Sequence, residues 1–210
     1  PYVIPGRTGT QLLPQDLAIL HSELPNVNTV KEATGNLENM KLTRKLCGEE
    51  FSILSGDDDK TYAMMTMPEI KSSGVISVAS NVIPKATQEF VSAIVNAKTE
   101  EVERLNKALK PLFGMVTVST QEETPYGPAL CKARNPLPYK TLTNILGMPS
   151  GPCRPPLGKM TKKGVETVLN TARTVYEATP DIFKPIEDFF DVDLSKRLRR
   201  KTSWRGLAYD

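Results

Sequence analysis

The chain has 210 residues, a formal net charge of +3, one histidine and three cysteines. This length can bury a substantial core, yet it falls below the roughly 250 residues typical of a complete eight-stranded β/α barrel. The small charge gives no argument for nucleic-acid binding, and one histidine excludes any site that needs two from this chain. The cysteines form neither a disulfide framework nor a CxxC pair, which favours the reducing cytoplasm. No apolar run is long enough to span a membrane, and no signal peptide is visible.

Residues 1–84 are expected to alternate short strands with helices, which is typical of a parallel sheet covered on its faces. Leu17, Leu20 and Leu24 recur at helical spacing after a proline suited to a first helical turn. The elements that follow are a strand at 27–31, a helix at 37–46, a strand at 51–54, a helix at 61–67 and a strand at 74–78.

After Pro84 the pattern predicts helices alone, so residues 85–175 are expected to form a helical domain. Residues 115–134 lack clear periodicity and are predicted to be a long loop. Thr161 is expected to cap a helix with an apolar stripe. Residues 176–210 form a tail extension, in which the basic run 196–201 is expected to be satisfied by an intramolecular or subunit contact.

Lys31 is the first candidate for chemistry. A β-prone run delivers it to the start of a Thr-Gly-Asn turn, where a barrel enzyme would place a reactive amine. A lysine attacks a ketone only as the free amine, and burial or a nearby cation favours that form. The alternative is a solvated lysine at the end of a strand.

Arg7 and Tyr2 lie just before this strand. Residues 5–9 (Pro-Gly-Arg-Thr-Gly) put the Arg7 guanidinium on a tight loop, where it can hold a carboxylate through two parallel hydrogen bonds. The Tyr2 phenol can move protons. A surface arginine and an ordinary core tyrosine are the alternatives.

Gly56 and Ile76 follow the next two strands. Glycine permits close backbone approach, and Gly56 stands in the turn after the strand at 51–54. Ile76 lies within the expected last strand. The alternative interpretations are an ordinary turn glycine at Gly56 and a core isoleucine at Ile76. The aspartates at 57–59 fit a solvated turn better than a metal site, because adjacent carboxylates rarely point at one ion.

Taken together, these motifs resemble the dihydrodipicolinate synthase family, whose members are pyruvate-dependent Schiff-base enzymes. The resemblance rests on residues 31–36 (Lys-Glu-Ala-Thr-Gly-Asn), about two dozen residues before 54–58 (Leu-Ser-Gly-Asp-Asp), and on Tyr2 five residues before Arg7. It covers residues 2 to 114 well and 135 to 175 moderately, with Asn-Pro-Leu-Pro at 135–138. The chain opens on Pro1 in mid-pattern, and we expect it to be the C-terminal part of a longer enzyme.

The resemblance implies a (β/α)8 TIM barrel, of which residues 1–84 hold the last strands, followed by a C-terminal α-helical domain. It implies that Lys31 forms an imine with pyruvate, that Tyr2 relays protons, and that Arg7, Gly56 and Ile76 contact substrate. The enamine would attack aspartate semialdehyde, giving 4-hydroxy-tetrahydrodipicolinate for lysine biosynthesis. No metal or organic cofactor is expected. Self-association into a homo-oligomer is expected.

Two other interpretations stay open. A related class I pyruvate aldolase, of the keto-deoxy-sugar acid or sialic acid lyase type, would share Lys31 and accept another aldehyde. Relatives of that kind tend to lack an arginine at the place of Arg7, which favours the synthase. A non-catalytic scaffold that retains the fold is the second alternative, because the family's relay also needs a threonine and a second tyrosine that this chain does not contain.

Overall fold

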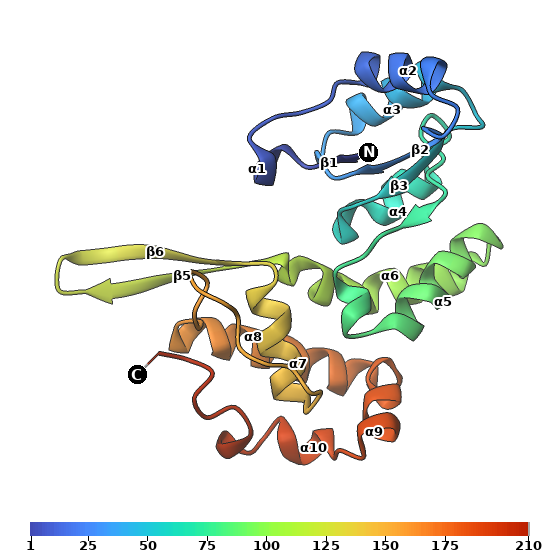
Figure 1. Cartoon of the computed structure of the whole chain (residues 1–210). Helices are drawn as coiled ribbons and strands as arrows, with labels where there is room; N and C mark the ends of the chain where they lie inside the picture. The colour runs from blue at the N-terminus through green and yellow to red at the C-terminus, as the bar shows by residue number, and fades with distance from the viewer. Residues whose placement is uncertain (210) are drawn as a thin grey trace. The chain divides into compact units, whose positions relative to one another are not determined.

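The computed structural model describes residues 1–209 as an α/β chain with two compact units (Figure 1). Residues 1–77 and 89–103 form the first unit; residues 78–88 and those from 104 onward form the second. The helices α5 (Pro84–Val95) and α6 (Thr99–Phe113) contribute to both units. The expected division of the chain at residues 84 and 175 stays a prediction.

The first unit is built on a four-stranded, fully parallel sheet in the order β1-β2-β3-β4 (Figure 1). Its strands are short: β1 (Tyr2–Val3), β2 (Thr29–Glu32), β3 (Ser52–Ser55) and β4 (Gly74–Val75). Parallel neighbours need a crossover connection, which helices provide here. The predicted α/β class with a parallel sheet is therefore confirmed.

The crossover helices cover one face of this sheet. They are α2 (Pro14–Glu23), α3 (Leu37–Cys47) and α4 (Thr61–Thr66). The connections also contain a one-turn helix α1 (Pro5–Thr8), which buries no residue, and a 3₁₀ turn η1 (Asp58–Lys60). Leu17 of α2, Met40 of α3 and Met64 of α4 are fully buried in one apolar cluster with Val30 and Ile53 of the sheet. Burial of these side chains is what fixes the helices on the strands.

Helix α3 shows how local signals and packing act together. Asn36 accepts hydrogen bonds from the first backbone N–H groups of the helix, and Gly48 ends it at a φ of +83°. Arg44 is buried on the inner face of α3. Its guanidinium donates to the backbone carbonyls of Gly48, Glu49, Phe51, Ile70 and Lys71 at 2.6–3.2 Å. Arg44 thereby fastens α3 to the entries of β3 and β4.

The second unit is mainly helical. In chain order it contains the 3₁₀ turn η2 (Ala79–Asn81), parts of α5 and α6, η3 (Gly114–Val116), α7 (Leu137–Leu146), α8 (Lys162–Ala178), η4 (Pro180–Ile182), α9 (Lys184–Phe190), α10 (Leu194–Arg197) and η5 (Lys201–Ser203). Thr161 caps α8 as predicted. Leu109, Leu142, Val168 and Phe183 are fully buried and draw α6, α7, α8 and the segment after η4 into one core.

The predicted loop at 115–134 is wrong, because these residues form an antiparallel hairpin of β5 (Thr117–Thr124) and β6 (Gly127–Arg134), drawn in yellow in Figure 1. Exposed and half-buried positions alternate along β6, but its one large apolar residue, Leu130, is exposed and the others are small or polar, so hydrophobicity does not carry the period of two. Thr120 hydrogen-bonds Thr161, and Lys163 donates to the Gln121 carbonyl. These contacts dock the hairpin on α8.

The tail is ordered by contacts within the unit, as expected for the basic run. Arg197 donates from Nε to the Ile145 carbonyl and from Nη2 to the Asn144 carbonyl, both at 3.0 Å. These carbonyls lie at the C-terminal end of α7, where a cation is favoured. Gly147 follows at a φ of +92°, and a Cβ there would lie 2.7 Å from Arg197 Nε. The tail therefore packs where a side chain at position 147 would clash.

Candidate active site

Lys31 lies on the face of the sheet opposite the crossover helices. Side chains alternate along a strand, and Val30 and Glu32 are buried on the helix side, so Lys31 points the other way. The strand register sets Tyr2 of β1 and Leu54 of β3 beside Lys31. Lys31 is the penultimate residue of β2, close to the carboxyl end of the strand, where catalytic groups of β/α folds gather.

Tyr2 and Lys31 are in direct contact. The Lys31 ammonium nitrogen Nζ lies 4.0 Å from the centroid of the Tyr2 ring. In its charged form, an ammonium over a ring face at this distance is attracted by the ring quadrupole, which orients the lysine side chain. Tyr2 is 48% exposed and is therefore not a core residue.

Gly56 follows β3 and lies against the same lysine. Its N–H donates to the Glu32 carbonyl at 2.7 Å, which extends the β2–β3 pairing by one residue. A Cβ at position 56 would lie 2.7 Å from Ala33 Cβ, 3.1 Å from the Glu32 carbonyl oxygen and 3.1 Å from Lys31 Cε. Only glycine fits here without moving the lysine.

Two carboxylates beside Lys31 were not singled out from the sequence as site residues. Glu32 is almost fully buried, and its Oε1 accepts the Thr34 N–H at 2.7 Å. Burial raises the pKa of the Glu32 carboxyl, against the lowering effect of the Thr34 hydrogen bonds. Burial, and next the charge of Asp59, raises the pKa of Asp57 as well, while Lys60 and Lys31 oppose that rise.

A signal for Glu32 was present in the sequence. An acidic residue directly after Lys31, at the position that alternation assigns to the core side, needs a partner there. The structure supplies that partner as the Thr34 N–H, in the turn where Gly35 has a φ of +70° and Asn36 caps α3. Glu32 thus stabilises the turn that follows β2.

Ile76 corrects two expectations. The predicted strand 74–78 ends at Val75, and Ile76 is 44% exposed, so it is neither a strand residue nor a core isoleucine. Its N–H still donates to the Ser55 carbonyl at 2.8 Å, next to Gly56. The physical reason for the exposure is that β4 lies at the edge of this four-stranded sheet, so within residues 1–209 no strand beyond it covers the Ile76 side chain.

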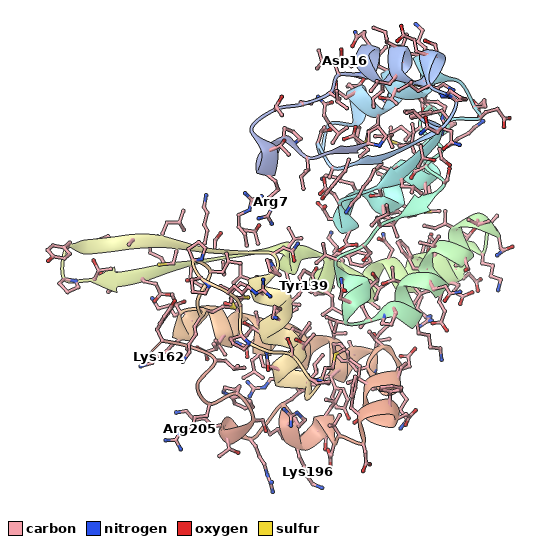
Figure 2. The ribbon with its side chains drawn as sticks, viewed as in Figure 1. Arg7, Asp16, Tyr139, Lys162, Lys196 and Arg205 are labelled. Carbon is pink, nitrogen blue, oxygen red and sulfur yellow. The ribbon has the colours of Figure 1, made fainter. Side chains whose placement is uncertain are left out.

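Arg7 lies on α1, directly after β1, and is exposed (Figure 2). Gly9 ends this one-turn helix at a φ of +68°, where glycine is favoured. The structure thus brings Tyr2, Lys31 and Gly56 together and sets Ile76 beside the Gly56 turn. Arg7 stands five residues after Tyr2 in the chain, and its place in the site stays a prediction.

A family model described as the dihydrodipicolinate synthetase family matches residues 2–175. The chain belongs to this family. A 4-hydroxy-tetrahydrodipicolinate synthase of Desulforamulus reducens is 32% identical over 83% of this chain and 53% of its own length. One from Sulfurihydrogenibium sp. is 35% identical over 82% of this chain and 53% of its own length. The chain therefore spans about half the length of the curated relatives it matches.

Solved structures of the family agree. The 4-hydroxy-tetrahydrodipicolinate synthase of Methylacidiphilum fumariolicum SolV superposes with a TM-score of 0.72 at 28% identity, over 86% of this chain and 55% of that one. The dihydrodipicolinate synthase of Thermotoga maritima gives a TM-score of 0.68 at 30% identity, over 83% and 54%. The dihydrodipicolinate synthetase match ends at residue 175, so the tail from 176 lies outside it.

Two further observations concern residues 1–209. No helix in that range is both long and apolar enough to cross a membrane. Within the same range, no group of three or more histidine, cysteine, aspartate or glutamate side chains is arranged to hold a metal ion.

Proposed function

We propose that this chain carries the Schiff-base centre of a synthase that condenses pyruvate with aspartate semialdehyde to 4-hydroxy-tetrahydrodipicolinate. The observation that carries the proposal is the contact set around Lys31. Its Nζ lies 4.0 Å from the Tyr2 ring, and its Cε lies where a side chain at Gly56 would stand. The membership in the dihydrodipicolinate synthetase family and the names of the curated relatives support this reaction.

The proposed architecture is an eight-stranded β/α barrel followed by a C-terminal helical domain. The four parallel strands would be neighbouring strands of that barrel, with the Lys31 face turned to its interior. This accounts for a sheet covered by helices on one face while Leu54 and Lys31 lie on the other. We propose a homo-oligomeric enzyme of the cytoplasm that uses small-molecule substrates.

In the proposed mechanism the free amine of Lys31 attacks the ketone carbon of pyruvate and water leaves, which gives an imine. Loss of a methyl proton gives an enamine, whose carbon attacks the aldehyde of aspartate semialdehyde and forms the new carbon–carbon bond. The amino group of the semialdehyde part then attacks the imine carbon and displaces the Lys31 amine, which closes the six-membered ring of the product and frees the lysine. Tyr2 moves protons in these steps, since its ring already lies against the amine. The imine is itself the electron sink, so no metal or organic cofactor is required.

Three residues would bind substrate. Arg7 would hold a carboxylate at the entrance through two parallel hydrogen bonds. The backbone beside Gly56 and Ile76 would face the pyruvyl group. Gly56 suits this role because it has no side chain, and the Ile76 N–H is bonded to the carbonyl of Ser55, the residue before Gly56. The arginine favours a semialdehyde over a sugar-derived acceptor.

Borohydride trapping with pyruvate tests the proposal. Imine reduction followed by peptide mapping is expected to label Lys31 in the native protein, to leave a Lys31→Arg variant unlabelled, and to label a variant of the exposed Lys45 (Lys45→Arg) normally. The same reaction on the 210-residue chain by itself measures whether these residues suffice. A folded native protein that takes no label on Lys31 would refute the Schiff-base assignment and favour a non-catalytic scaffold.

The acceptor is tested separately, once the adduct is established. Turnover with aspartate semialdehyde is compared with turnover on sugar-derived aldehydes. Preference for the semialdehyde, lost in an Arg7→Ala variant through a raised KM, is the expected result. A trapped Lys31 adduct with preference for a sugar aldehyde would instead assign the chain to the related pyruvate aldolases.

A further inference from the structure

A cavity of about 840 Å³ lies in the second unit between α8 and the C-terminal segment 201–209. Small-molecule sites commonly measure roughly 300–1,000 Å³, so this volume suits a ligand of moderate size. One wall comes from residues that follow the family match, which ends at residue 175. The cavity is therefore a feature of this chain rather than of the matched region alone.

The segment that closes the cavity is tied to the unit by its own backbone. Tyr209 donates its N–H to the Met160 carbonyl, and its hydroxyl accepts the Lys159 N–H, each at 3.1 Å. Ala208 pairs with Met160 as an isolated parallel bridge. Gly158 stands under the Tyr209 ring at a φ of +55°, where a Cβ would overlap the hydroxyl. Position 158 therefore accommodates this closure only as glycine.

The cavity has an apolar floor on α8 and an aromatic side chain opposite it. Val165 and Leu169 recur one turn apart on α8 and are nearly fully buried, so they present hydrocarbon rather than polar groups. Trp204 lines the opposite side. Arg173 holds this arrangement, because its guanidinium carbon lies 5.6 Å from the Trp204 ring centroid while its Nε donates to the Leu198 carbonyl at 2.9 Å. A flat ring can rest on such a floor.

The rim is cationic. Lys162, Lys201 and Arg205 join Arg173 among the lining residues, against the single carboxylate of Glu166. Lys162 is also the first residue of α8, where the helix dipole favours an anion. Figure 2 shows Lys162 and Arg205 on the two separate segments that border this cavity, α8 and the C-terminal segment. Positive groups thus lie on both walls of the cavity.

We propose that this cavity binds an organic anion with a planar ring, such as a nucleoside monophosphate, with the ring on Trp204 and the α8 floor and the anionic group among Lys162, Lys201 and Arg205. Neither part of the site suffices alone. An apolar cavity by itself would not explain the four cations in its lining, and a cationic surface by itself would not explain a cavity lined by a tryptophan. The proposal is independent of the chemistry at Lys31.

Trp204 is the single tryptophan of the chain, so its fluorescence reports directly on this cavity. The protein is titrated with adenosine monophosphate, with adenosine as the ring alone and with inorganic phosphate as the anion alone. Saturable quenching by the monophosphate is expected, with at least about tenfold weaker binding of either fragment, since one charge-assisted contact is worth about that much. A Trp204→Phe variant identifies the part of the signal that comes from this residue.

The matched variants separate the cavity from general positive charge. A Lys201→Gln, Arg205→Gln double variant is expected to weaken binding about a hundredfold, because two charge-assisted contacts are lost. Arg200→Gln removes a neighbouring exposed cation that does not line the cavity and should leave binding unchanged. Circular dichroism checks that each variant is folded.

The opposite results would overturn the proposal. Absence of saturable quenching in folded protein removes the site. Adenosine binding as tightly as the monophosphate removes the anionic half of the assignment, and phosphate alone binding as tightly removes the ring. A loss of about tenfold in Arg200→Gln, the share of one cation in the double variant, would show that binding follows net charge rather than the cavity.

Discussion

Gly56→Ala is the substitution with the most definite consequence for the site. Its new Cβ would lie 2.7 Å from Ala33 Cβ, whereas ordinary contact begins at 3.4 Å, so one of the two must retreat by about 0.7 Å. The backbone cannot yield easily, because Gly56 N–H holds the Glu32 carbonyl at 2.7 Å. The flexible neighbour is the Lys31 side chain, whose Cε would be 3.1 Å away.

The magnitude follows from these distances. Overpacking of this kind costs about 1–3 kcal/mol in the free energy of unfolding. Displacement of a reacting group by a fraction of an ångström lowers its rate substantially, and a shift of about 1 Å costs on the order of a hundredfold. We therefore expect borohydride trapping at Lys31 to slow by about tenfold to a hundredfold.

Urea unfolding and the rate of trapping with pyruvate are measured side by side. Gly114→Ala is the control, since a Cβ at position 114 meets nothing within 4 Å and its φ is ordinary. It should match or slightly exceed the parent in stability, because alanine restricts the unfolded chain more than glycine does. A Gly56→Ala protein with unchanged stability and trapping rate would refute the contact geometry around Lys31.

Tyr2→Phe keeps the ring on Lys31 and removes the hydroxyl, so we expect condensation turnover to fall about a hundredfold with little change in stability; steady-state kinetics beside urea unfolding checks this. Arg44→Met should lower the free energy of unfolding by about 4 kcal/mol, because five backbone carbonyls lose a buried donor, while exposed Lys45→Met on the same helix should change it little. Folding raises the pKa of Glu32 above its ordinary 4.5, so the folded state holds that proton more tightly. Glu32 therefore contributes stability below pH 4.5 that is lost as the pH rises through the raised pKa. Glu32→Gln should flatten this fall in the urea midpoint, and exposed Glu50→Gln should reproduce the parent profile.

Local signals were sufficient for α3 and α8, but not for α1, α9 and α10, which the sequence did not predict. Asn36 and Gly48 bracket α3, and Thr161 opens α8, because caps act through hydrogen bonds within a few residues of the helix end. The same holds for the strand at Lys31, where apolar β-branched residues stop at a turn. The motif around Lys31 was also sufficient to identify the family, which the match over residues 2–175 confirms.

Contacts between distant residues were decided by the tertiary structure. Tyr2 meets Lys31 because β1 and β2 pair in parallel, and the register of that pairing depends on which side chains the helices bury. The exposure of Ile76 follows in the same way from the edge position of β4. Sequence spacing alone specifies neither.

The hairpin and the tail show most plainly what could not be predicted from the sequence. The strands β5 and β6 carry mostly small and polar residues, with Val118 buried and Leu130 exposed, so the hydrophobic period that predicts strands is missing. Their pairing is accompanied by docking on α8. The tail residues become a cavity wall only because Tyr209 returns to Met160, some fifty residues earlier in the chain. The sequence by itself determined helices such as α3 and α8, the candidate lysine and the family. Packing decided which residues surround that lysine and where the second cavity lies, because those contacts join segments that carry no local signal for one another.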